Sequence, residues 1–156
     1  MVNKMRSQEL TLYEQDFNLW LEDTVILLRE QKLLQVDWEN LIAEIESMGR
    51  SEKNALKSNL RILLMHLLKY RYQPEKRTNS WRYTISKHRQ HLEDALEISP
   101  SLTSLLQESL GKCYQQSRKL AADETGLPLK MFPSDCPFLL DDILDLDYLP
   151  DEARSD

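Results

Sequence analysis

Residues 56–68 read LKSNLRILLMHLL, and this stretch decides the fold class. Six leucines recur within it at intervals of three and four, which is the spacing of one face of an α-helix. Ile62 and Met65 add apolar bulk on other sides, so most of the helix circumference is apolar. A helix of this kind is normally surrounded by others. We therefore expect it to be the central helix of an all-α protein.

The helical period continues on both sides of this stretch. The central helix is expected to begin at Ser51, a good N-cap residue, after a preceding helix that ends at Gly49. Four further helices are predicted at residues 12–31, 37–49, 79–98 and 100–125. The predicted fold is an all-α, single-domain irregular bundle of five main helices.

The C-terminal part of the chain has a different character. Glycine and three prolines interrupt residues 126–137, and only residues 137–144 look helical, with Asp135 as a cap. Apolar residues recur through to Leu149, which indicates that this segment packs over the bundle. We expect one helical domain over residues 12–150, an N-terminal extension over 1–11 and an acidic tail over 151–156.

Composition narrows the class of protein. Hydrophobic residues make up 41% of the chain and charged residues 29%, as in ordinary globular proteins. The longest apolar run is far shorter than a bilayer requires, so no membrane association is expected. The N-terminus lacks the apolar stretch of a secretory signal, which predicts a cytoplasmic protein. Cys113 and Cys136 have no metal-ligand spacing and are expected to be reduced thiols.

Charge is distributed unevenly along the chain. Residues 61–91 contain eight Lys or Arg against one acid, whereas residues 135–156 contain eight acids against one Arg. These two segments could meet within one molecule. No motif in the sequence indicates an oligomeric state.

Four ordered motifs closely resemble one bacterial family, the "domain of unknown function 29" family. They are VDWENLIAEIESMGRSE (36–52), LLMHLLKYRYQPEKRTNSWRYTISKHR (63–89), AADETGLP (121–128) and FPSDCPFLLDDILDLDYLP (132–150). With the opening LYEQDFNLWLEDTVILLREQ, the resemblance spans residues 12–150. It implies a compact α-helical fold and no assigned activity. The family usually has two adjacent acids before ESMG, but here Ala43 replaces one and only Glu44 remains.

Three residues are candidates for chemistry. Glu44 lies on the apolar stripe of its helix, where a carboxylate needs a partner such as Arg61, Arg82, Arg89 or a histidine. Glu44, His66 and His88 could together form a metal site of a metal-dependent enzyme. The structural alternative is a buried ion pair and two hydrogen-bonded core histidines.

Motifs of catalysis are missing from the sequence. It has no HExxH, no GxSxG and no glycine-rich phosphate loop, so we expect no cofactor and favour a protein that is not an enzyme.

Two binding functions remain open. The leading hypothesis is a non-catalytic module that binds another protein through the face around residues 70–81. The alternative is nucleic-acid binding by residues 61–91, because cations attract phosphates and aromatic rings stack on bases. For either partner, the candidate surface residues are Arg71, Lys76, Arg77, Arg82, Arg89 and Tyr72.

Overall fold

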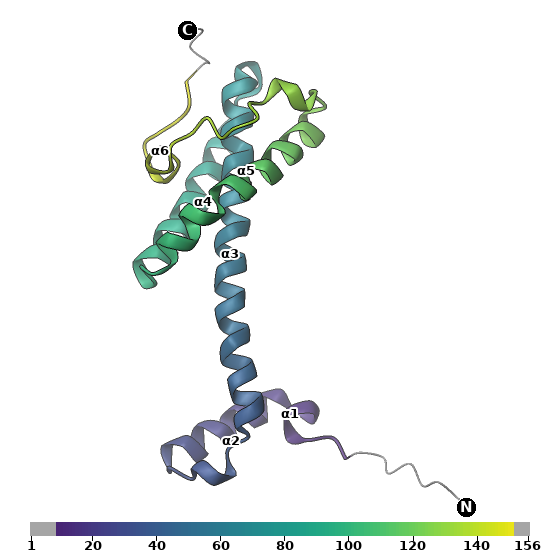
Figure 1. The fold of residues 1–156 in the computed structure, drawn as a ribbon, viewed down its shortest axis with the longest axis vertical. Coiled ribbons are helices and arrows are strands. Elements are labelled where there is room, and N and C mark those ends of the chain that lie inside the picture. The colour runs from purple at the N-terminus through teal and green to yellow at the C-terminus, as the bar shows by residue number, and fades with distance from the viewer. Residues whose placement is uncertain (1–8, 152–156) are drawn as a thin grey trace, which may run out of the picture. The chain divides into compact units, whose positions relative to one another are not determined.

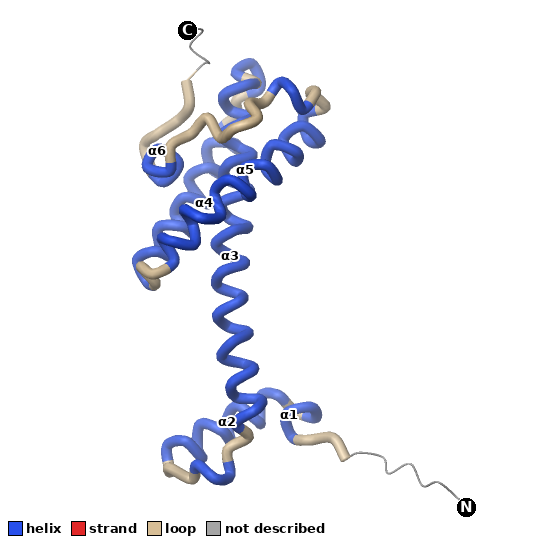
Figure 2. Tube along the Cα trace, in the orientation of Figure 1, coloured by secondary structure: helices blue, strands red, loops and turns tan. Residues whose placement is uncertain are grey.

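The computed structural model describes residues 9–151. The helices are α1 (Leu12–Gln15), α2 (Phe17–Arg29), α3 (Trp38–Tyr72), α4 (Asn79–Ile98), α5 (Leu102–Thr125) and α6 (Leu140–Leu144). Short 3-10 turns lie at Leu33–Gln35, Pro74–Lys76 and Leu129–Met131. Figures 1 and 2 show that the described residues form helices and loops but no strand. The all-α prediction is confirmed. Most of the predicted N-terminal extension (1–11) and acidic tail (151–156) lies outside the described residues.

The chain forms two compact units, one up to Arg50 and one from Ser51 onward. The boundary falls inside α3, which contributes its first turns to the first unit and its later turns to the second. The single domain over residues 12–150 stays a prediction.

The predicted helix end at Gly49 is wrong. α3 is one helix of 35 residues that passes through Gly49, so Ser51 is not a cap and two expected helices are one. Among the glycines, only Gly126 has a positive φ, and a Cβ placed on Gly49 would meet no atom within 4 Å. Glycine weakens a helix interior by about 1 kcal/mol relative to alanine. Continuing an existing helix is easier than nucleating a second one, which explains why Gly49 does not end α3.

The other helix boundaries follow local capping chemistry. The predicted first helix is divided at Asp16, whose carboxylate accepts a hydrogen bond from the Leu19 N–H at 3.0 Å and so starts α2. Asp37 caps α3 as expected, accepting from the Asn40 N–H at 3.2 Å.

Two boundaries further along the chain also have clear causes. α4 is capped by Thr78, one residue before the expected position, through a bond from the Trp81 N–H at 3.2 Å. α5 ends at Gly126 in the left-handed conformation, as predicted.

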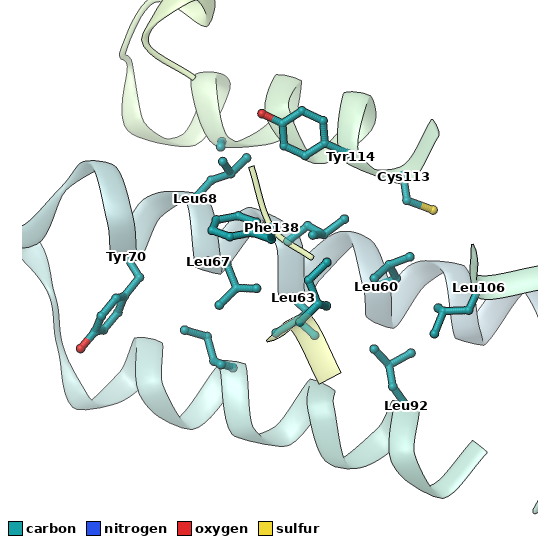
Figure 3. Close-up of a cluster of buried hydrophobic side chains, with 14 of the residues drawn as sticks. Leu60, Leu63, Leu67, Leu68, Tyr70, Leu92, Leu106, Cys113, Tyr114 and Phe138 are labelled. Atoms are coloured by element: carbon teal, nitrogen blue, oxygen red, sulfur yellow. The ribbon is translucent and has the colours of Figure 1, made fainter. Parts of the chain in front are cut away.

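The core of the second unit confirms the prediction that its leucine-rich helix is central. Five leucines of α3 have no exposed surface: Leu60, Leu63, Leu64, Leu67 and Leu68. All five belong to one core cluster with Leu92 of α4, Leu106 and Tyr114 of α5, and Phe138 of the C-terminal segment. Figure 3 shows four of these leucines, Leu60, Leu63, Leu67 and Leu68, within this cluster. Tyr114 is fully buried, and its hydroxyl donates to the Pro133 carbonyl.

The C-terminal segment packs on the second unit, as expected. Phe132, Phe138 and Ile143 are buried in the core cluster. The predicted boundaries of its helix are wrong, because α6 begins at Leu140 rather than Pro137 and Asp135 does not cap it. Leu139 is extended and no side chain caps the helix, so the burial of Phe138 prevails over the local capping signal. None of the helices in residues 9–151 has the length and apolar character needed to span a bilayer.

Candidate protein-interaction surface

Glu44 is held by a tyrosine rather than by a cation. The Tyr13 hydroxyl of α1 donates a hydrogen bond to Glu44 Oε1 on α3, and this bond raises the pKa of Tyr13. The Tyr13 ring packs edge-on against Trp20 of α2, with centroids 4.9 Å apart. The expected partners of Glu44, an arginine or a histidine, are therefore wrong. Glu44 joins α1 to α3 within the first unit and is only half-buried.

The two candidate histidines hydrogen-bond within the second unit. His66 Nδ1 lies 2.9 Å from the Ile62 carbonyl, which can only accept, so this nitrogen carries the proton. His88 Nδ1 lies 2.7 Å from Asn59 Oδ1, and His91 Nδ1 lies 3.2 Å from the same oxygen. Burial lowers the pKa of both His66 and His88.

The proposed metal site is not assembled. Within the described part of the chain, no three His, Cys, Asp or Glu side chains gather as metal ligands. Glu44 belongs to the first unit and contacts Tyr13, whereas His66 and His88 belong to the second. Sequence reasoning missed His91, although its spacing of three from His88 places both on one side of α4.

We call residues 61–91 the basic segment. Two of its arginines donate hydrogen bonds to backbone oxygens of the C-terminal segment. Arg89 is 1% exposed, and its guanidinium donates to the carbonyls of Ile143 at 2.8 Å and Asp142 at 3.3 Å, at the end of α6. Arg77 donates to the Tyr70 carbonyl at 2.7 Å and to the Pro150 carbonyl at 3.3 Å. The basic segment and the acidic end do meet, but these bonds go to carbonyl groups rather than carboxylates.

Two aromatic residues of the same segment, Tyr72 and Trp81, pack against other side chains of the second unit. Tyr72 packs edge-on against Phe132 at 5.7 Å, with Arg71 over its other side. Trp81 is covered by the ammonium of Lys69, which lies 4.5 Å from the ring centroid. Lys69 also pairs with Glu124 at 2.7 Å.

Few of the predicted surface residues are therefore open to solvent. Lys76 and Arg82 are exposed, whereas Arg71, Arg77 and Tyr72 are half-buried and Arg89 is buried. A surface built from two exposed cations is a weak basis for binding a polyanion.

The first unit exposes a large amount of apolar surface. Among residues 9–151, thirteen of the twenty large hydrophobic side chains that are exposed lie between Leu10 and Met48. Four of them follow one side of α2 at helical spacing: Phe17, Leu21, Val25 and Leu28. On α3, Trp38, Ile42 and Ile45 repeat at intervals of four and three. Ile42 is 52% exposed and Phe17 is 44% exposed. We call these seven residues the apolar surface of the first unit.

This apolar surface lies in an acidic unit. Residues 9–50 contain ten acids against three bases, a net charge of −7, whereas residues 51–151 are neutral overall. Two of the three bases already pair with acids, Lys32 with Glu30 at 2.7 Å and Arg50 with Glu46 at 3.9 Å. The first unit therefore combines exposed apolar side chains with a net negative charge over residues 9–50.

Part of this surface lies on α2, within the helix predicted over residues 12–31. The apolar period predicts a helix over residues 12–31, but only Trp20 and Thr24 of α2 are buried. Periodicity shows which side of a helix is apolar, and it cannot show whether the same chain covers that side.

The comparisons with known proteins concern the family alone. The sequence matches the family described as "Domain of unknown function DUF29" over residues 12–149. The chain belongs to this family. The resemblance stated from its motifs is confirmed, and the DUF29 match includes both compact units. No curated protein and no solved structure matches the chain.

Proposed function

We propose that this DUF29 protein is a non-catalytic helical module that binds another protein through the apolar surface of its first unit. The observation that carries the proposal is the exposure of the seven apolar side chains along α2 and the start of α3. Several exposed apolar side chains along one side of a helix are more than a monomeric protein normally leaves uncovered, and such surfaces are typical of protein interaction sites. Burying one such side chain stabilises a complex by about 1.5–3 kcal/mol.

The chemistry of the surface indicates the kind of partner. Helical side chains spaced by three and four residues fit an amphipathic helix laid along them. A net charge of −7 over residues 9–50 favours a basic partner and disfavours a second copy, because two such surfaces would repel each other. The partner proposed is a basic amphipathic helix of another protein. We also propose a cytoplasmic location, because both cysteines are free thiols and thiols stay reduced in that compartment.

The two alternative functions, nucleic-acid binding and a metal-dependent reaction, have less support. Nucleic-acid binding by residues 61–91 would need cations that are free to approach phosphates, but Arg77 and Arg89 are bound to backbone carbonyls. A metal-dependent reaction would need Glu44 to act with His66 and His88, and these residues belong to different units.

A synthetic helical peptide with one leucine face and one lysine face tests the proposal. Fluorescence anisotropy should show saturable binding to the full chain, and Val25→Ser and Ile42→Ser should each weaken it about tenfold. Both side chains are exposed, so the fold should tolerate either change. The matched control is Ile98→Ser, which alters an 81% exposed side chain of the second unit.

Three results would contradict the proposal. The first is equal loss of binding in Ile98→Ser. The second is equal binding of a peptide in which glutamate replaces every lysine. The third is a dimer of the protein alone in sedimentation velocity that Ile42→Ser dissociates, because a second copy would then be the occupant.

A further inference from the structure

A pocket of about 460 Å³ opens between α3 and α5 in the second unit. Lys57 and Arg61 line it from α3, one turn apart, and Glu108 and Lys112 line it from α5, also one turn apart. The buried side chain of Cys113 lies at its inner wall. The volume falls within the range of small-molecule sites.

Three cations converge on this pocket against one carboxylate. None of Lys57, Arg61 and Lys112 takes part in an ion pair within residues 9–151. This concentration of positive charge stands out because residues 51–151 are neutral overall. A cleft that gathers one sign of charge attracts ligands of the opposite sign.

Arg61 is hydrogen-bonded to α5 through both its side chain and its backbone. Its guanidinium Nη1 donates to Gln116 Oε1 at 3.2 Å, and its backbone carbonyl accepts from the Ser117 hydroxyl at 2.8 Å. Gln116 lines the same pocket, so this bond holds the guanidinium beside it. An oriented guanidinium presents several N–H donors that suit a phosphate.

We propose that this pocket binds a small phosphate ester. Three cations and one carboxylate leave two positive charges, which match the charge of about −1.5 to −2 on a phosphate monoester at neutral pH. Lys57, Arg61 and Lys112 hold the phosphate. Glu108 and Ser109 accept hydrogen bonds from hydroxyl groups of the organic part.

The pocket is a binding site and not a reaction centre. Burial raises the pKa of the Cys113 thiol, although Arg61, Lys57 and Lys112 oppose this effect. A thiol of raised pKa is a poor nucleophile, so Cys113 supplies packing at the wall. The site is independent of the first unit and of the partner proposed for it.

Calorimetric titration of the full chain with a hexose 6-phosphate, at constant ionic strength, tests this assignment. We expect saturable binding, and Arg61→Gln and Lys112→Gln should each weaken it about tenfold or more. Lys53→Gln is the matched control, because Lys53 is an exposed cation of α3 that does not line the pocket. The free hexose should not bind, and inorganic phosphate should bind more weakly than the ester.

Several outcomes would overturn the proposal. Absence of saturable binding at millimolar ester is one, and equal weakening by Lys53→Gln is another. Binding of a single-stranded oligonucleotide that depends on Arg61, with no binding of the ester, would assign the same cations to a polymer instead. Glu108→Gln adds an independent readout: it should strengthen binding of inorganic phosphate and reduce the preference for the ester.

Discussion

At the scale of single residues, the polar groups that the sequence marks as unusual are satisfied by near neighbours. Glu44 accepts a hydrogen bond from Tyr13, and His66 donates to a carbonyl one turn earlier. These bonds explain why acidic and imidazole side chains are tolerated beside apolar ones. Each bond therefore holds its side chain to a neighbouring group within its own unit.

The histidines predict how stability depends on pH. Burial lowers the pKa of His66 and His88 in the folded protein, so below about pH 6.5 the unfolded chain takes up protons first. The free energy of unfolding should therefore be highest above pH 6.5 and fall as the pH drops toward the lowered pKa values. Urea unfolding at pH 8, 7, 6 and 5 measures this, and His66→Gln should reduce the slope.

The comparison at pH 8 separates titration from packing. At that pH both histidines are neutral in either state, so any difference between the natural protein and His66→Gln reports packing alone. An unchanged slope between pH 7 and 5 in the variant would rule out His66 as a source of the acid sensitivity.

At the scale of elements, the continuity of α3 makes Gly49 a testable position. A Cβ at Gly49 would meet no atom within 4 Å, and its φ is not positive. Gly49→Ala should therefore raise the free energy of unfolding by about 0.5–1 kcal/mol through helix propensity. Urea unfolding monitored by circular dichroism at 222 nm measures the change.

Gly126 supplies the contrasting variant. Its φ is +71°, so Gly126→Ala should lower the free energy of unfolding by about 1–2 kcal/mol. If Gly49→Ala behaved like Gly126→Ala, the chain would have a helix end at Gly49, and α3 would not be continuous there.

At the scale of the whole molecule, the stability of the second unit depends on its C-terminal segment. The buried guanidinium of Arg89 holds this segment through hydrogen bonds. Arg89→Met removes the bonds to Ile143 and Asp142 and leaves two carbonyls without donors, which should cost about 2–4 kcal/mol of unfolding free energy. Limited proteolysis should then cleave residues 129–151 faster than in the natural protein.

Two further variants serve as controls for Arg89→Met. Arg82→Met changes an exposed cation on the same helix and should alter stability by less than about 0.5 kcal/mol. Arg89→Lys should fail to restore stability, because one ammonium cannot reproduce two guanidinium bonds. Cleavage at an unchanged rate in Arg89→Met would show that apolar burial of Phe138 and Ile143 holds the segment without Arg89.

The fold was predictable to the extent that local pattern determines it. The leucine spacing of residues 56–68 predicted the central helix, and Gly126 predicted the end of α5, because both effects depend on neighbouring residues. Gly49 misled the prediction, since a glycine can either end a helix or continue in it. The partner of Glu44 was also beyond prediction: Tyr13 lies 31 residues away, and no periodicity couples the two.

The amino-acid order alone established helices, an apolar side for each one, a basic middle and an acidic end. Tertiary structure decided which of those apolar sides are covered: the later turns of α3 are buried, whereas α2 and the first turns of α3 are exposed. It also turned Arg77 and Arg89 inward to backbone carbonyls and gathered Lys57, Arg61 and Lys112 around one pocket. The reason is that periodicity is a property of one helix, whereas burial and charge pairing depend on groups that distant parts of the chain bring beside it.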